Sequence, residues 1–84
     1  MNSKQAKALK TIFAVPVSGS VPWAMIESLL RSIGCDVIEG KGSSVSFHLN
    51  GTIAYFHRPH PEKEAKRYQV KAAREFLEKN GIKP

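Results

Sequence analysis

The sequence predicts an α+β fold: a three-stranded antiparallel sheet with two helices on one face, plus an extra helix at the N-terminus. Three observations predict it. Two long segments repeat apolar residues at helical spacing, the pair Asn50-Gly51 separates two short strand-like runs, and 84 residues suit a single domain. We expect this domain to consist of an N-terminal helical extension, 1–19, and an α-β-β-β-α core, 20–84.

The three helices are predicted from apolar spacing and from the residues that begin and end helices. The first covers 3–14 and ends before Pro16, and the second has Ser20 as its N-cap and runs to Ile33. The last covers 64–80 and precedes a glycine suited to a left-handed cap. Their apolar faces consist of Ala6, Leu9, Ile12 and Phe13; of Trp23, Ile26, Leu29, Leu30 and Ile33; and of Val70, Ala73, Phe76 and Leu77.

The three strands are predicted at 35–39, 44–49 and 52–57. Asn50-Gly51 favours a type I′ turn because both residues tolerate a positive φ. A two-residue loop pairs residues 49 and 52, and alternate positions then share one face of the sheet. The core face is predicted to hold Val45, Phe47, Leu49, Thr52, Ala54 and Phe56. The solvent-exposed open face is predicted to hold Ser44, Ser46, His48, Ile53, Tyr55 and His57.

Charge and composition narrow the classes of protein. Lys and Arg number 13 against 7 Asp and Glu, and the formal net charge of +6 favours a polyanionic or acidic partner. Cys35 is the single cysteine, so neither an internal disulfide nor a thiolate zinc cluster is possible, and a reducing cytoplasm is expected. No apolar run suits a membrane helix. His57 and His60 lack a third ligand at a suitable spacing, so we expect no metal and no other cofactor.

The open face has a composition suited to RNA. Lys41, Arg58 and Lys63 flank it and can neutralise phosphates, Tyr55 can stack on an unpaired base, and a histidine can exchange a proton near neutral pH. The same polar side chains are also typical of the solvated face of an antiparallel sheet. The proline-flanked segment that presents Arg58 and His60 is equally compatible with a rigid structural loop.

Several segments resemble a known family in their order and spacing: Trp23-Ala-Met-Ile-Glu-Ser-Leu-Leu, Gly40-Lys-Gly-Ser43, Phe56-His-Arg-Pro-His-Pro61, and Arg74-Glu-Phe-Leu77 followed by Asn80-Gly-Ile82. The chain resembles the HicA-type toxins of bacterial type II toxin–antitoxin systems. The resemblance implies a double-stranded-RNA-binding-domain-like fold, an RNA-cleaving toxin that blocks translation, and neutralisation by a HicB-type antitoxin.

The family pattern of glycine, serine and histidine is only partly present. Gly42 and Ser43 match it, whereas Ser44 stands at the position of the histidine that the family resemblance implies is catalytic. A serine does not replace an imidazole as proton acceptor at neutral pH without an activating base of its own. Three explanations stay open: this member is inactive, the histidine was engineered away, or another group has taken its place. His57 lies opposite Ser44 in the predicted register, and under the third explanation we expect His57 to supply the base.

The sequence therefore predicts a metal-independent endoribonuclease with catalytic positions Ser44 and His57. The predicted RNA contacts are Lys41, Ser43, His48, Tyr55, Arg58, His60 and Lys63. The expected partners are mRNA and a HicB-type antitoxin, with no membrane and no DNA bound by the toxin alone. Two alternatives stay open: an RNA-binding module without catalysis, and a subunit whose basic surface only docks an acidic antitoxin. The extension 1–19 is compatible with covering the sheet, binding RNA or contacting the partner.

Overall fold

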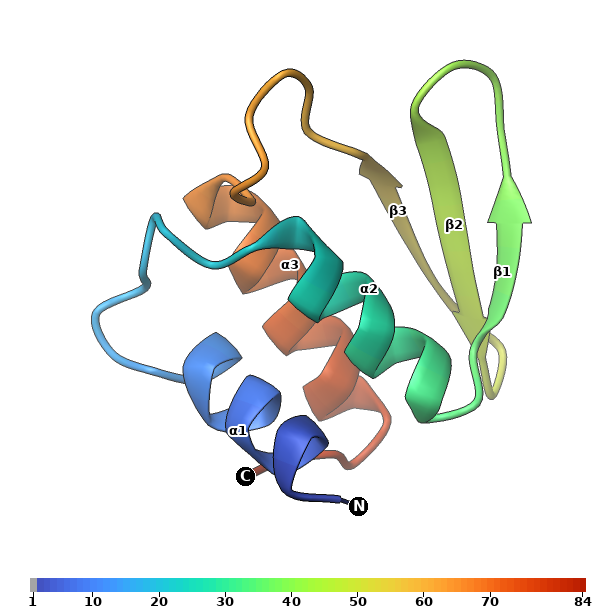
Figure 1. Ribbon diagram of the computed structural model, residues 1–84. Coiled ribbons are helices and arrows are strands. Elements are labelled where there is room, and N and C mark those ends of the chain that lie inside the picture. Colours follow the sequence, from blue (N-terminus) through green and yellow to red (C-terminus); the bar gives the residue numbers. More distant parts are fainter. Residues whose placement is uncertain (1) are drawn as a thin grey trace.

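The computed structural model describes residues 2–84, which form three helices and one three-stranded antiparallel sheet (Figure 1). The strand order within the sheet is β1-β2-β3, the order of the sequence. The predicted α+β fold is confirmed, with α1 preceding an α-β-β-β-α arrangement. The elements are α1 (Ser3–Ile12), α2 (Trp23–Ser32), β1 (Asp36–Glu39), β2 (Ser44–Leu49), β3 (Thr52–His57) and α3 (Arg67–Lys79).

Helices α2 and α3 cover one face of the sheet, and α1 packs on these two helices on the side away from the sheet (Figure 1). Trp23 of α2 anchors the layer between helices and strands. Its ring centroid lies 5.1 Å from that of Phe56 and 6.4 Å from that of Phe47. The indole Nε1–H donates a hydrogen bond of 2.9 Å to Glu27, so burial leaves no indole donor unpaired. Trp23 of the predicted α2 stripe thus faces the sheet, and Ile26, Leu29 and Leu30 of the stripe are buried in the same core.

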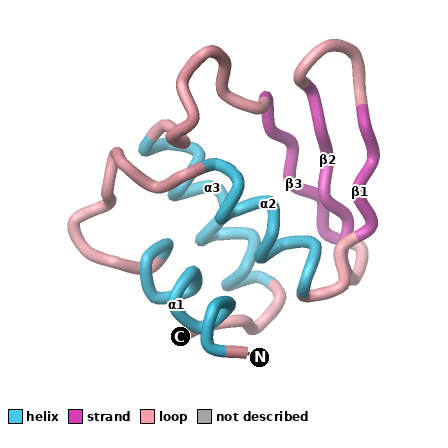
Figure 2. The backbone as a smooth tube through the Cα atoms, in the orientation of Figure 1, coloured by secondary structure: helices cyan, strands magenta, loops and turns pink. Residues whose placement is uncertain are grey.

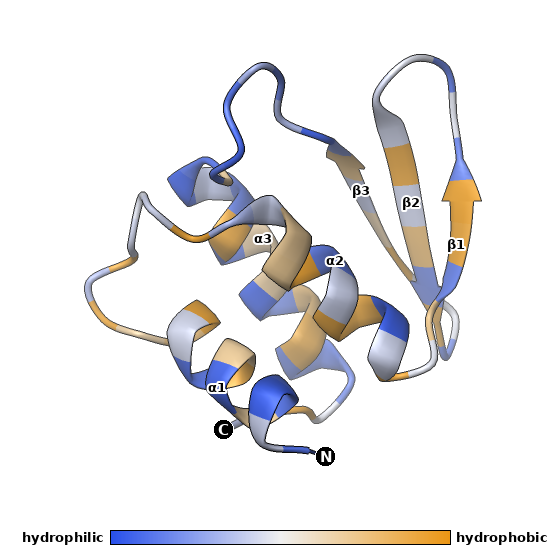
Figure 3. Cartoon of the chain, viewed as in Figure 1, coloured by the Kyte–Doolittle hydropathy of each residue, from blue (hydrophilic) through white to orange (hydrophobic). Residues whose placement is uncertain are grey.

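The β2–β3 hairpin has the predicted register. Asn50 and Gly51 have φ values of 50° and 78°, as a type I′ turn requires. Pairing extends from this turn to Ser44 opposite His57. Hydropathy alternates along β2 (Figure 3), because successive side chains point to opposite faces of the sheet. On the predicted core face, Leu49 and Thr52 beside the turn are half-buried, and the fully buried residues are Val45, Phe47, Ala54 and Phe56.

The N-terminal helix α1 is a packed part of the fold. Of its predicted apolar residues, Leu9 and Ile12 are buried and Phe13 is half-buried. Ala6 is exposed, which contradicts the predicted stripe. Ala8 takes the buried place instead, because it lies four residues before Ile12 and therefore on the same side of the helix.

An arginine of α3 holds the C-terminal end of α1. The Arg74 guanidinium donates hydrogen bonds of 2.9 and 3.2 Å to the carbonyl oxygen of Ile12 and one of 2.9 Å to that of Ala14. It also lies over the Phe13 ring, 5.7 Å from the centroid. These carbonyls have no partner within the helix, so a cationic donor is favourable there.

The start of α2 differs from the prediction. The helix begins at Trp23, and its N-cap is Pro22, which makes no side-chain capping bond. Ser20 is not the cap, because its hydroxyl pairs with that of Ser18 at 3.0 Å. The other ends of the helices and strands lie within two residues of the predicted ones, except the start of α3.

Helix α3 begins at Arg67, three residues after the predicted start. The preceding residues are extended, because Glu64 forms an antiparallel bridge with Pro22. The Ala65 N–H donates to the carbonyl oxygen of Val21 at 2.7 Å. This bridge joins the two long loops, which connect α1 to α2 and β3 to α3 (Figure 2).

Candidate functional site

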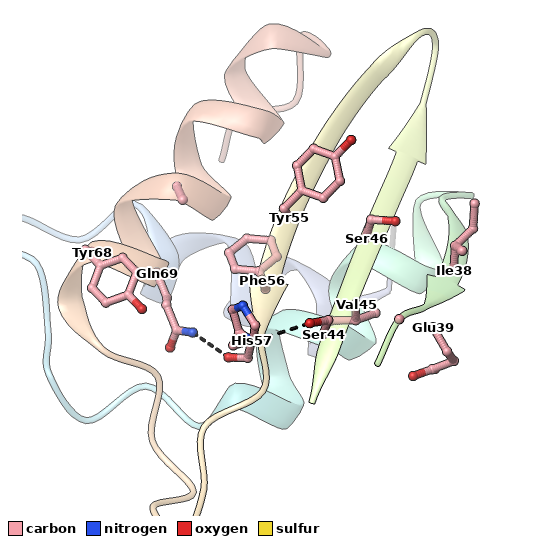
Figure 4. Close-up of a pocket in the computed structure, with 12 residues that line it drawn as sticks. Ile38, Glu39, Ser44, Val45, Ser46, Tyr55, Phe56, His57, Tyr68 and Gln69 are labelled. Carbon is pink, nitrogen blue, oxygen red and sulfur yellow. Dashed lines mark hydrogen bonds between the residues drawn. The ribbon is translucent and has the colours of Figure 1, made fainter. Parts of the chain in front are cut away.

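Ser44 and His57 face each other where β2 begins and β3 ends (Figure 4). The Ser44 Oγ atom lies 3.4 Å from His57 Nδ1, a long hydrogen bond. The His57 side chain is exposed, and Ser44 is half-buried. The predicted pairing is therefore confirmed, and it places an imidazole next to the position where the family resemblance expects a histidine.

Backbone hydrogen bonds fix this end of the sheet on both sides of Ser44. The Gly40 N–H donates to the carbonyl oxygen of Ser44 at 2.8 Å, and the Arg58 N–H donates to that of Ser43 at 2.9 Å. A Cβ atom on residue 40 would lie 2.9 Å from the Cβ of Ser44, which is closer than such atoms approach. A glycine at position 40 therefore leaves room for the Ser44 side chain.

Gln69 ties the end of β3 to the start of α3. Its Nε2–H donates to the carbonyl oxygen of His57 at 2.8 Å, and its Oε1 accepts from the Lys66 N–H at 2.9 Å. The Gln69 side chain is buried, with both ends of its amide hydrogen-bonded. This amide therefore fixes the backbone from which the His57 imidazole projects.

Arg58 is held by two carboxylates. Its guanidinium donates at 2.9 and 3.1 Å to Glu27 of α2 and at 2.6 and 3.0 Å to Glu39 of β1. Arg31, four residues after Glu27 on α2, donates two further bonds to Glu27, of 2.9 and 3.1 Å. This cluster of four side chains, the Arg58 cluster, joins α2, β1 and the segment after β3. Arg58 was predicted to contact RNA, but two carboxylates already balance the charge of its guanidinium.

The hydrogen bonds of the Arg58 cluster shift the pKa values of Glu27, Glu39 and Arg58. The hydrogen bonds from Arg58 lower the pKa of Glu27 to about 2. Burial of the carboxyl group opposes this shift, and hydrogen bonds from Arg31 and Trp23 add to it. The pKa of Glu39 is lowered by the hydrogen bonds from Arg58. Those from Glu39 and Glu27 raise the pKa of Arg58. These two carboxylates and the Arg58 guanidinium are therefore charged at neutral pH.

The open face is less exposed at its centre than predicted. Ser46 is only 9% exposed, because its strand lies in the middle of the sheet and its neighbours Ile38 and Tyr55 flank it on both sides. The Ser46 hydroxyl hydrogen-bonds with His48 Nε2 at 2.9 Å. The predicted RNA contact at His48 therefore lies beside Ser46, four positions along β2 from Ser44.

The other predicted site residues fall into two groups. Tyr55 is 75% exposed and lies on β3, two residues before His57 and on the same face. The loop residues, by contrast, are exposed around the site: Lys41 and Ser43 between β1 and β2, and His60 and Lys63 between β3 and α3.

A depression of about 380 Å³ lies between the uncovered face of the sheet and the start of α3 (Figure 4). We call it the hollow; its lining includes Ser44, Ser46, Tyr55, His57, Tyr68 and Gln69. The structure thus brings Ser44, Tyr55 and His57 to one site, while the predicted loop residues lie outside its lining.

Sequence reasoning did not predict the roles of Tyr68 and Gln69. A signal for Tyr68 was present: it precedes Ala72 by four residues and Phe76 by eight, so it continues a line along the side of α3. No comparable pattern marks Gln69, because a buried glutamine is recognised by its hydrogen-bond partners and these come from distant parts of the chain.

Residues 23–82 match the family model described as "HicA toxin of bacterial toxin-antitoxin". The chain belongs to the HicA toxin family. This confirms the resemblance predicted from the sequence, and the match to the HicA family runs from the first residue of α2 to beyond α3. It includes Ser44 and His57 and leaves α1 outside. No curated protein and no solved structure matches the chain, so the double-stranded-RNA-binding-domain-like description stays a prediction.

Two further findings concern residues 2–84. No helix among them is long and apolar enough to cross a membrane; α3, the longest, has 13 residues. In the same part of the chain, no three His, Cys, Asp or Glu side chains are grouped so that they could hold a metal ion.

Proposed function

We propose that this HicA family member is a metal-independent endoribonuclease that cleaves mRNA, blocks translation in the cytoplasm and is neutralised by a HicB-type antitoxin. Family membership supports the toxin role. The observation that carries the nuclease assignment is the exposed imidazole of His57, which lies in the hollow with its Nδ1 atom 3.4 Å from the Ser44 hydroxyl. A histidine is the side chain best suited to accept a proton near neutral pH.

His57 acts as the general base in this mechanism. When its Nδ1–H donates to Ser44 Oγ, the lone pair lies on Nε2. Nε2 takes the proton from a ribose 2′-hydroxyl, the O2′–phosphorus bond forms, and the phosphorus–O5′ bond breaks. A second proton donor protonates the departing O5′, and a 2′,3′-cyclic phosphate remains. Ser44 orients the imidazole and does not itself accept the proton.

The cations around the hollow have different tasks. Lys41 and Lys63 are exposed and balance the charge of the RNA phosphates. Arg58 positions the end of β3 through Glu27 and Glu39, directly after His57. The remaining predicted RNA contacts, Ser43, His48 and His60, belong to the surface around the hollow.

Expression without antitoxin tests the proposal. The original chain, His57→Ala and Ser44→His are compared for growth, for RNA integrity and for cyclic-phosphate ends. We expect the original chain to arrest growth and leave cyclic phosphates, and His57→Ala to slow cleavage by ~10²–10⁴-fold because one positioned base is lost. Circular dichroism serves as the control for folding, and His57 is exposed, so its truncation is compatible with the fold.

Other outcomes assign other functions. If Ser44→His is toxic and the original chain is not, the original chain keeps the fold and lacks the nuclease activity. RNA binding without cleavage in the original chain would favour the RNA-binding module. The serine at position 44, where the family resemblance implies a catalytic histidine, supports this role. Co-expression with a HicB-type antitoxin is expected to restore growth, and a pure docking subunit would leave growth unaffected in its absence.

A further inference from the structure

The two tyrosines of the chain, Tyr55 and Tyr68, both line the hollow. They come from different elements, β3 and α3, and lie on different sides of His57 (Figure 4). Tyr55 is 75% exposed and Tyr68 is 64% exposed. Two large aromatic side chains are thus presented to solvent at the one site that carries the Ser44–His57 pair.

These rings differ from the other aromatic side chains nearby. Trp23, Phe47 and Phe56 are buried and contact one another, with ring centroids 5.1–6.4 Å apart. Within residues 2–84, neither tyrosine ring packs on another ring and neither hydroxyl makes a hydrogen bond. Packing of the core therefore does not account for Tyr55 and Tyr68.

We propose that Tyr55 and Tyr68 bind an unpaired nucleobase by stacking, and that the substrate of this site is single-stranded RNA. The volume of about 380 Å³ falls at the lower end of the range for small-molecule sites and suits one base rather than a helix. Stacking on exposed aromatic rings is the usual way to hold unpaired bases, whereas the bases of a duplex hide their faces in the stack.

The chemistry around the rings suits a nucleotide. The formal net charge of +6 attracts the phosphates, and Ser44 and His57 in the same hollow offer polar atoms to the ribose and phosphate. Tyr68 and His57 line the same hollow, so a base held at Tyr68 would share this site with the imidazole. This inference rests on the proposed function, because it assigns the substrate of the same site.

The test uses short single-stranded RNA with 2′-O-methyl riboses, which binds but has no free 2′-hydroxyl for cleavage. Ring NMR signals of labelled tyrosine report on the site directly, because the chain has two tyrosines and both line the hollow. We expect the signals of both rings to move upfield on titration. Tyr55→Leu and Tyr68→Leu should each weaken binding by roughly 5- to 150-fold, the loss typical of one stacked base.

Matched variants separate stacking from other effects. Tyr55→Phe and Tyr68→Phe keep the rings and should bind as the original chain does. Ile53→Ala removes an exposed apolar side chain from the same face of β3 but outside the lining of the hollow, and should also leave binding unchanged.

Three results would overturn the inference: a 2′-O-methyl duplex that binds as tightly as the single strand, Tyr→Leu variants with unchanged affinity, or RNA binding that leaves the tyrosine signals in place. The last would assign the rings to a protein partner. Because the probe is not cleavable, failure of base binding and failure of the nuclease assignment are separate results.

Discussion

His57 and Arg58 are neighbours in the chain with opposite roles. His57 projects its imidazole into the hollow, whereas the Arg58 side chain is held by Glu27 and Glu39. Side chains alternate between the faces of a strand, so the last residue of β3 can present a reactive group while the next anchors it. The anchoring depends on charge, because each of the two arginines in the Arg58 cluster lies within 4.0 Å of both carboxylates.

The ionisation of Glu27 should stabilise the fold in a defined pH range. Its pKa of about 2 in the folded chain lies below its ordinary value of 4.5, so the charged form is favoured by folding. The contribution is present above pH 4.5 and is lost as the pH falls from there toward 2. Glu27→Gln should lower the free energy of unfolding by about 2–3 kcal/mol at pH 7, because it leaves Arg58 and Arg31 without this partner.

Urea denaturation of the original chain and of Glu27→Gln across this pH range measures the effect. The difference between the two should shrink as the pH is lowered. Glu75→Gln is the matched control, because Glu75 is exposed and has no ion pair within residues 2–84. A difference that stays constant from pH 7 to pH 2 would contradict the assigned role of Glu27.

At the scale of elements, α1 shows how an N-terminal extension becomes part of the core. It lies outside the matched residues 23–82, yet it buries Leu9 and Ile12 against α2 and α3. It packs on the side of the helices away from the sheet (Figure 1), so it does not cover the hollow. Of the roles left open by the sequence, covering the sheet is therefore wrong.

Arg74 should be the main polar link between α3 and the end of α1. Arg74→Gln shortens the side chain and removes charge-assisted hydrogen bonds to the carbonyl oxygens of Ile12 and Ala14, and should lower the free energy of unfolding by about 1–3 kcal/mol. Lys71→Gln, an exposed change on the same helix, should cost less than about 0.5 kcal/mol. Equal losses in thermal or urea denaturation for the two variants would show that Arg74 does not anchor α1.

At the scale of the whole molecule, one face of the sheet is left uncovered by the helices. The helices bury the core face of the sheet, so the opposite face, with the hollow, is the surface left for a large ligand (Figure 1). Lys41 and Lys63 lie in the loops that border this surface. We expect the phosphates of an RNA strand that crosses this face to contact both lysines.

Salt dependence should identify which lysines contact phosphates. Each phosphate contact contributes a slope of about −0.7 to the plot of log binding constant against log salt for single strands. Lys41→Gln and Lys63→Gln should each reduce the slope by about this amount for non-cleavable RNA. Lys4→Gln, on α1, should leave it unchanged. A slope that responds equally to all three changes would indicate diffuse attraction by net charge instead.

Much of the fold could be predicted because its signals are local. The spacing of Ile26, Leu29 and Leu30 reports one buried helix face, and Asn50-Gly51 sets the register that pairs Ser44 with His57. The start of α3 could not be predicted in the same way. Residues 64–66 stay extended because Glu64 and Ala65 pair with residues far along the chain.

The α+β order of elements, the hairpin register and the family can be read from the sequence, because turn residues, apolar periods and motif order are properties of neighbouring positions. Three features follow from the three-dimensional packing alone: Arg58 is paired with Glu27 and Glu39, Ser46 is buried, and Tyr68 and Gln69 join the site. Each of these depends on distances between elements, and packing of α2 and α3 against the sheet sets those distances.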